Sequence, residues 1–173
     1  MSLQQIKWTE RKFEFASPLG TFPCILQRFR GTPARLEELV QGYPSDTLVS
    51  RPNDAWSMQE HAGHLLDLEE LGERRLQEFL TGKPILSAAD MGNRKTYEAN
   101  HNARAITAIL KDFRKARLEL AAKFDALDET EVSLSSLHPR LNKQMRIIDW
   151  VFFMAEHDDH HLARIQTLGA RSR

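Results

Sequence analysis

The segment 102–127 constrains the fold most, because its apolar residues recur at spacings of three and four. Charged residues occupy the positions between them, which is the pattern of a helix with one buried face. The apolar positions are Ile106, Ile109, Leu110, Phe113, Leu120 and Phe124. The segment therefore predicts one long amphipathic helix.

Two other segments, 23–41 and 144–168, also carry apolar residues at helical spacing. The first is interrupted near Gly31, where Thr32 can cap a new turn that begins at Pro33. The second contains an apolar stripe at Ile147, Trp150, Met154, Ile165 and Leu168. Both segments are predicted to be helices.

A further helix is predicted over 57–80. Ser57 is a good N-cap residue, and Glu60 stands at the position that completes a capping box. Thr81, Gly82 and Pro84 then end the helix. Four helices with no competing strand pattern predict an all-α fold, an up-and-down four-helix bundle, as a single domain over 1–173.

The connections between the helices differ in length. Residues 1–22 are expected to form a packed N-terminal arm, because Pro18 and Gly20 break any regular element there. Residues 85–97 form a long irregular connection of the kind that crosses a bundle or covers a site. A loop containing Pro139 precedes the last helix.

Charge and composition exclude several function classes. Lys plus Arg number 24 and Asp plus Glu number 24, so no positive field recruits nucleic acid. No apolar run is long enough to span a membrane, and the N-terminal residues lack the apolar region of a signal peptide. The one cysteine, Cys24, suits a reducing compartment and is expected to be a buried thiol. We therefore expect a cytoplasmic protein.

The stretch AEHDDHHLARI, residues 155–165, places three histidines in the last predicted helix. At 100° per residue, His157 and His161 fall within the apolar stripe, whereas His160 lies about 100° away from it. Two imidazoles one turn apart on one face can bind a single transition metal. Buried histidines are also often hydrogen-bonded core residues, so the pair alone is only suggestive.

The second predicted helix offers a partner for this pair. The stretch QEHAGHLLDLEE contains His61 and His64. Its apolar stripe admits His61 at least as well as His64, so periodicity does not choose between them.

Two motifs together resemble the DinB/YfiT-like family of metal-dependent proteins. They are W-S-x-x-E-x-x-x-H-L-x-D-x-E over 56–69 and AEHDDHHLARI over 155–165. RKFEF, GTPARLEELV, SRP and the segment from HPRL to DW also resemble one DinB-like subgroup, so the similarity covers nearly the full chain. The resemblance implies that His64, His157 and His161 bind a divalent metal, zinc or nickel.

The resemblance also suggests a function. Three histidines leave a coordination position open, which separates such a site from a closed structural one. Family members include S-transferases that use low-molecular-weight thiols such as bacillithiol or mycothiol, and hydrolases. We therefore expect a metal-dependent enzyme with a small-molecule substrate, either a thiol S-transferase or a hydrolase, whose catalytic base is unknown. The alternative is a non-catalytic metal-binding or dimer-forming bundle.

Several other residues are candidates near the site. Asp158, Asp67, Glu156 and Asp159 are candidates for accepting a ring N–H of a ligand histidine, with Asp158 first. His61 is expected to orient a neighbour or to line the site, and His160 to face solvent or a partner subunit. Trp56 and Trp150 are expected to be core residues that can also roof a cavity, and His138 is a loop residue near its mouth. An anionic thiol would need cations, which Arg94, Lys95 and Arg104 could supply, but we expect these residues rather to form a solvated charged face.

A homodimer is the expected assembly. The family resemblance suggests it, and burial of the exposed aromatic residues Trp8, Phe13 and Phe15 of the arm would favour it.

Overall fold

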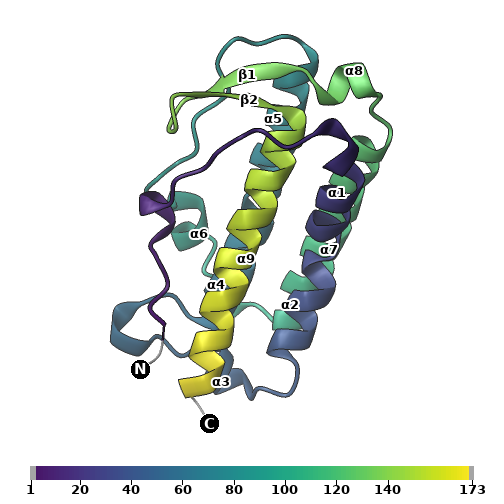
Figure 1. Ribbon diagram of the computed structural model, residues 1–173. Helices are drawn as coiled ribbons and strands as arrows, with labels where there is room; N and C mark the ends of the chain where they lie inside the picture. The colour runs from purple at the N-terminus through teal and green to yellow at the C-terminus, as the bar shows by residue number, and fades with distance from the viewer. Residues whose placement is uncertain (1–2, 172–173) are drawn as a thin grey trace.

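The computed structural model describes residues 3–171 and consists of four long helical segments packed around two hydrophobic clusters (Figure 1). The predicted four-helix bundle is confirmed. Residues 1–2 of the expected arm and 172–173 of the expected domain lie outside the described part. The four segments are α1 (Phe22–Arg30) with α2 (Thr32–Val40), α4 (Met58–Asp67) with α5 (Glu69–Leu80), α7 (Ile106–Asp125), and α9 (Ile147–Arg171).

The predicted helix boundaries are largely correct. Helix α1 ends at Gly31, as expected, and a proline stands in the first turn of α2. At the start of α4, the Ser57 hydroxyl accepts the backbone N–H of Glu60, whose carboxylate accepts the backbone N–H of Ser57. The predicted capping box is therefore present. The segment predicted as one helix over 57–80 changes from α4 to α5 at Leu68.

The connectivity of the bundle departs from simple up-and-down order at one step. Residue numbers rise together along α5 and α7, because Glu69 pairs with Arg117 and Glu73 pairs with Lys123. The two segments are therefore parallel. Connection 81–105, which includes α6 (Arg94–Glu98) and η4 (His101–Ala103), returns the chain along the side of the bundle (Figure 1). The expected crossing connection thus places α6 and η4 against α4.

The sequence did not predict a short β-hairpin at one end of the bundle. Strands β1 (Ser135–His138) and β2 (Lys143–Arg146) pair antiparallel, with Ser135 opposite Arg146. Each strand has only four residues, too few to display a clear alternation of apolar and polar residues. The last helix consequently begins at Ile147 rather than near residue 144. A short helix, α8 (Glu129–Val132), precedes the hairpin.

The N-terminal arm packs on its own chain. It contains the short turns η1 (Trp8–Glu10) and η2 (Leu19–Thr21) and crosses the hairpin before entering α1 (Figure 1). Phe13 is buried, and the Trp8 ring lies 5.1 Å from Phe13 and 5.0 Å from Phe153. Phe15 packs partly buried against the same cluster. The expectation that these aromatics are exposed for a dimer is therefore wrong.

Three further findings concern the connection before α4, the cysteine and the character of the helices. Helix α3 (Ser45–Val49) and the turn η3 (Pro52–Asp54) connect α2 to α4. Cys24 is exposed on α1, so the prediction of a buried thiol is wrong. None of the helices in the described part of the chain has both the length and the apolar character of a membrane span.

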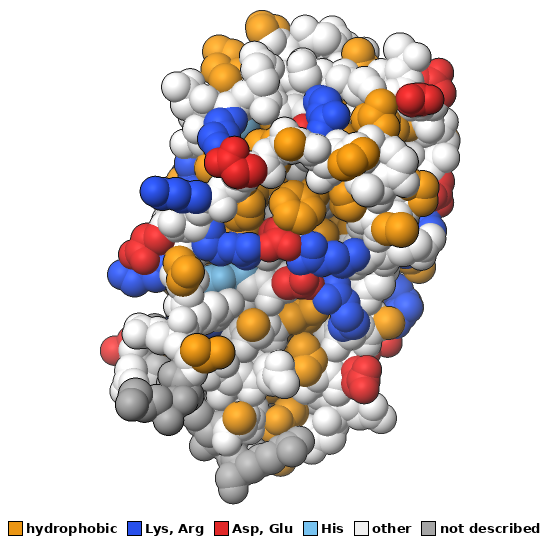
Figure 2. Space-filling view, in the orientation of Figure 1, with side chains coloured by type: hydrophobic (Ala, Val, Ile, Leu, Met, Phe, Trp, Pro, Cys, Tyr) orange, Lys and Arg blue, Asp and Glu red, His pale blue; other side chains and the backbone are white. Residues whose placement is uncertain are grey.

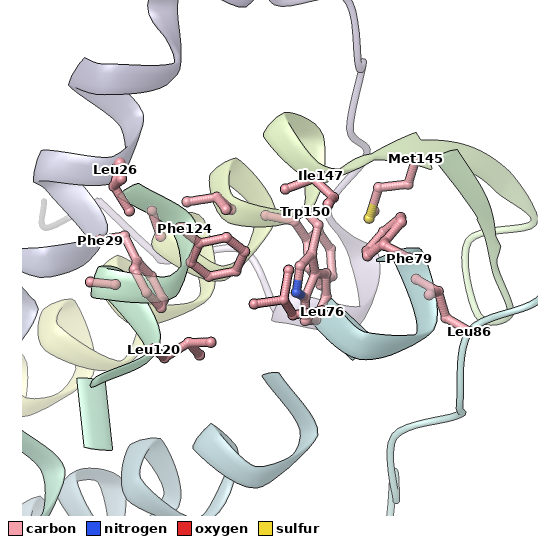
Figure 3. Close-up of a cluster of buried hydrophobic side chains, with 14 of the residues drawn as sticks. Leu26, Phe29, Leu76, Phe79, Leu86, Leu120, Phe124, Met145, Ile147 and Trp150 are labelled. Atoms are coloured by element: carbon pink, nitrogen blue, oxygen red, sulfur yellow. The ribbon is translucent and has the colours of Figure 1, made fainter. Parts of the chain in front are cut away.

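The core is divided by a layer of polar side chains. One hydrophobic cluster contains Phe79, Phe124 and Trp150, and Figure 3 shows the Trp150 indole in the middle of it. The other cluster contains Leu65 and Phe113 nearer the opposite end of the same helices. Buried polar residues lie at the intervening helical positions: His64, Glu69, Arg117, Asp158 and His161.

Candidate metal centre

Helices α4 and α9 bring the predicted ligand histidines together. The ring centroids of His64 and His161 are 4.8 Å apart, and those of His64 and His157 are 5.4 Å apart. The prediction that the second and fourth bundle helices adjoin is therefore confirmed. These two helices run antiparallel, since His61 meets His161 while His64 lies beside both His157 and His161.

The three side chains have the geometry of a metal-binding group. One ring nitrogen from each of His64, His157 and His161 can be chosen so that all lie within 4.8 Å of one another. The Nε2 atoms of His157 and His161 are 3.2 Å apart. Two ligands of a tetrahedral zinc ion, each about 2.0 to 2.1 Å from the metal, are separated by about 3.3 Å. The residues present therefore fit a divalent metal.

The histidines are also in the protonation state that binds a metal. Burial lowers the pKa of His64 to about 4 and that of His61 to about 3. Burial and the neighbouring histidines hold the pKa values of His157 and His161 well below the usual range. All four imidazoles are therefore neutral at pH 7, with a lone pair free to coordinate.

The second ring nitrogen of His64 has a partner from the crossing connection. His64 Nδ1 lies 3.0 Å from the hydroxyl oxygen of Thr96 in α6, which leaves Nε2 for a ligand. The Thr96 hydroxyl also hydrogen-bonds Asp67, which accepts from His101 Nε2 at 2.8 Å. Asp67 thus acts on His64 through Thr96, and the expectation of direct contact is wrong. Such outer contacts fix the ring orientation of a ligand histidine.

His161 has a different outer partner. Its Nδ1 lies 2.8 Å from Nδ1 of His61, so that its Nε2 faces His157. His61 therefore orients a neighbour, as expected, from the position one turn before His64 on α4.

Asp158 does not contact a ligand histidine. Its carboxylate is buried and accepts hydrogen bonds from Arg117 and from the Thr32 hydroxyl. Arg117 also donates to Glu69. The prediction of Asp158 as the acceptor is wrong, because the buried guanidinium of Arg117 provides a stronger partner than a neutral imidazole.

Glu156 and Asp159 were further candidates for this acceptor, and both lie outside the site. Figure 2 shows a band of basic and acidic side chains across the middle of this face. Arg28 bonds both carboxylates, Arg35 bonds Asp159 at 2.6 Å, and Arg11 bonds Glu156. These ion pairs attach the arm, α1 and α2 to the outer face of α9.

His160 lies against the N-terminal arm. It is half-buried, and its Nδ1 lies 3.0 Å from Gln5 Nε2, while its ring packs 5.8 Å from Trp8. The arm therefore covers part of the side chain that was expected to face solvent, and contact with a partner subunit stays a prediction.

A cavity of about 560 Å³ opens beside the three histidines. Trp56 lines it, and its ring centroid is 4.8 Å from that of His64 and 6.1 Å from that of His161. Trp150 and His138 also line it, and both are buried. Trp56 is half-buried and covers the histidines, so the expectation of a core residue holds for Trp150 but not for Trp56. His138 lines the cavity, but it is a buried residue of β1 and not the expected loop residue.

The sequence profile of the DinB superfamily matches residues 28–165. The chain belongs to the DinB superfamily. Among solved structures, it is similar to YfiT from Bacillus subtilis, which is described as a probable metal-dependent hydrolase with an unusual four-helix bundle topology. The TM-score is 0.81 at 19% sequence identity, over 94% of each chain, so the likeness concerns the fold. No curated protein matches the chain.

In this DinB-superfamily chain, the cations considered for an anionic thiol lie on the surface. Arg94 lies 3.8 Å from Glu98, and Lys95 and Arg104 bond Glu70 and Asp112. These exposed ion pairs agree with the expectation of a solvated charged face. Three arginines line the cavity, Arg75, Arg117 and Arg140, and the charge of Arg117 is paired with Glu69 and Asp158. The sequence did not point to Arg75 or Arg140. Arg75 follows Gly72 by three residues and precedes Phe79 by four, so a charge on the inward stripe was the available signal.

Proposed function

We propose that this member of the DinB superfamily is a metal-dependent enzyme. In this proposal His64, His157 and His161 hold one divalent metal ion, zinc or nickel, and the adjoining cavity admits a small-molecule substrate. The observation that carries it is the convergence of three neutral, largely buried imidazoles at the wall of a cavity of about 560 Å³. Among the described residues, no Asp, Glu or Cys joins this group, which favours an open coordination position.

Residues around the three histidines would orient the ligand rings and cover the proposed metal site. A bound divalent ion would supply a Lewis acid that activates a water molecule or a thiol. Thr96 holds the His64 ring through Nδ1, and His61 holds the His161 ring in the same way. Trp56 covers the rings and limits the access of bulk water.

Hydrolysis is the reaction that we propose first. Three neutral ligands leave the full charge of a divalent ion to lower the pKa of a bound water. The description of YfiT as a probable metal-dependent hydrolase agrees with this reaction. Transfer of a low-molecular-weight thiol is the second candidate, because the cavity contains Arg75 and Arg140, which suit an anionic cofactor.

Elemental analysis of the purified chain and of two variants tests the metal. Wild type should hold about one ion per chain, and His161→Ala should lose it, because one of three ligands is removed. His160→Ala is the matched control, since its Nδ1 bonds Gln5 and not another histidine. A metal that persists in His161→Ala and is lost in His160→Ala would contradict the ligand assignment.

Activity is then measured on ester and amide substrates and on conjugation of thiols to electrophiles. The metal-loaded wild type and His160→Ala should turn over one class, whereas His161→Ala should turn over neither. A metal-loaded chain that is inactive across both classes would instead favour the non-catalytic metal-binding bundle. The homodimer is a separate proposal from the family resemblance, and a stable monomer in sedimentation would exclude it.

A further inference from the structure

Two buried arginines, Arg117 and Arg75, differ in whether a carboxylate balances their charge. Arg117 is 2% exposed and bonds the carboxylates of Glu69 and Asp158. Arg75 is 1% exposed, yet it forms no ion pair with a described residue. Its guanidinium donates to the Ser87 carbonyl oxygen at 2.6 and 2.9 Å and lies 3.2 Å from His138 Nε2. A buried charge without a counterion is costly, so its retention suggests that a ligand supplies one.

Two further residues that line the same cavity, Trp150 and Arg140, carry buried hydrogen-bond donors without partners. Trp150 is 4% exposed, and its Nε1 has no hydrogen-bond partner. Nη2 of Arg140, in the hairpin turn, is also buried without a partner. The Arg75 guanidinium lies 4.6 Å from the centre of the Trp150 ring, and the charge of Arg140 acts on Arg75, so the three side chains belong to one part of the cavity wall. Buried donors normally have partners, so two donors without one near an unpaired cation suit an anion.

The electrostatics of this region are positive at neutral pH. The pKa of Arg75 is lowered to about 10, because burial outweighs the opposing charge of Glu78 and the charge of Arg140 acts in the same direction as burial. Burial also lowers the pKa of Arg140. His138 is neutral, because burial and both arginines lower its pKa to about 3. Arg75 therefore remains protonated, so this part of the cavity has a cationic wall.

We infer that Arg75, Arg140 and Trp150 bind the carboxylate group of a small molecule whose opposite end reaches the three histidines. An indole N–H and a guanidinium N–H without partners can donate to the oxygen atoms of a carboxylate, and the Arg75 guanidinium supplies the charge. One continuous cavity joins these donors to His64, His157 and His161. The inference rests on the proposed function for the reaction, because it names the class of substrate or thiol cofactor, but binding of the carboxylate does not require the metal.

Calorimetric titration of the full chain tests this binding, with phenylacetate and phenylacetamide as probes. The two have nearly the same shape, but only phenylacetate carries a charge. Phenylacetate should bind about 10-fold or more tightly than the amide, because charge-assisted hydrogen bonds are the stronger ones. The titration is repeated after removal of metal with a chelator, which excludes coordination of the carboxylate to the metal as the cause.

Three variants locate the binding. Arg140→Gln should weaken phenylacetate binding about 10-fold and leave the amide unchanged. Trp150→Phe removes the indole N–H together with part of the ring, so it should weaken phenylacetate binding about 3-fold more than it weakens binding of the amide. Arg104→Gln is the control, since that guanidinium bonds Asp112 on the surface. Melting curves identify any variant that fails to fold, and Arg140→Gln is preferred to a change at Arg75 for that reason.

Each outcome decides between alternatives. Equal binding of phenylacetate to wild type and Arg140→Gln, binding only with metal present, or no binding would overturn the inference. If the purified chain does not bind a divalent metal, phenylacetate binding that depends on Arg140 would uphold the inference while contradicting the proposed function. Mercapto acids of increasing chain length then show whether the carboxylate belongs to a thiol cofactor or to a substrate. Affinity that rises when the metal is loaded indicates a thiol cofactor, and unchanged affinity indicates a substrate acid.

Discussion

Nδ1 of His61 lies 2.8 Å from Nδ1 of His161, which joins the two helices through a pair of imidazoles. Sequence periodicity admitted both His61 and His64 to the inward face of α4. The structure separates their positions, because the His64 ring lies beside both His157 and His161, whereas His61 contacts the far side of the His161 ring. Mutation of His61 and mutation of His64 should therefore have different effects on metal binding.

His61→Ala should weaken metal binding without abolishing it. The variant removes the hydrogen-bond partner of a proposed ligand, and loss of such a partner typically lowers metal affinity about 10 to 100-fold. Competition with a chromogenic chelator measures the change. His64→Ala is the comparison, and its loss should be much larger. If both variants bound metal equally well, the distinction between ligand and supporting histidine would be wrong.

Arg117→Met should destabilise the fold strongly. The variant leaves the carboxylates of Glu69 and Asp158 buried without their cation, and breaking a buried ion pair in this way costs about 3 to 5 kcal/mol. Burial raises the pKa of Glu69 even though Arg117 opposes this, so Glu69 would be prone to protonation in the variant. Urea denaturation measures the free energy of unfolding.

The exposed pair of Arg114 and Glu37 provides the control for that experiment. Arg114→Met should change the free energy of unfolding by less than about 1 kcal/mol, because surface ion pairs contribute little. A loss in Arg117→Met no larger than in Arg114→Met would mean that the buried network contributes no stability.

Gly63→Ala should disturb the contact between α4 and the crossing connection. A Cβ atom at this position would lie 2.2 Å from the ring of His101, which is 1% exposed. The ring would have to move away from Asp67, and Asp67 hydrogen-bonds Thr96 beside His64. We expect a lower melting temperature and weaker metal binding.

Ala62→Gly is the matched control on the neighbouring residue, because it lowers helix propensity without adding an atom. It should lower the melting temperature without a specific effect on the metal. Gly63→Ala with normal metal affinity would show that His101 does not support the site.

The parts of the fold that the sequence predicted are those with repeated local signals. Helical spacing along 102–127 and the capping box of Ser57 and Glu60 both depend on residues within a few turns of one another. The hairpin escaped detection because its strands have four residues each. The parallel arrangement of α5 and α7 also has no local signal, since it depends on the path of the connection 81–105.

In the site, too, the residues that the sequence predicted are those with a local signal within one helix. His157 and His161 are one turn apart on one helix, so their spacing alone suggested a pair. Thr96 and Arg75 were missed because each reaches the site from another element, and only the packed structure brings them there. Asp158 lies next to His157 in sequence, yet the helix directs it to Arg117 instead. Proximity in the sequence therefore did not predict which residues hydrogen-bond the ligand histidines.

Glu60 connects the stability of the bundle to pH. Burial raises the pKa of its carboxylate, but the hydrogen bonds from Arg51 and Ser57 outweigh this, so the pKa lies below the ordinary value of 4.5. A carboxyl group whose pKa is lower in the folded state stabilises the fold above the ordinary pKa, and this contribution is lost as the pH falls through the folded-state pKa. Stability from Glu60 is therefore complete at pH 7 and decreases below about pH 4.

Glu60→Gln removes this contribution and should lower the free energy of unfolding at pH 7 by about 1 kcal/mol, the typical effect of a lost helix cap. The difference between wild type and variant should shrink as the pH is lowered towards 3, because protonation of Glu60 in wild type has the same effect as the substitution. Urea denaturation across this pH range, with exposed Glu119→Gln as the control, measures both quantities. A difference that stays constant with pH would show that the charge of Glu60 does not stabilise the start of α4.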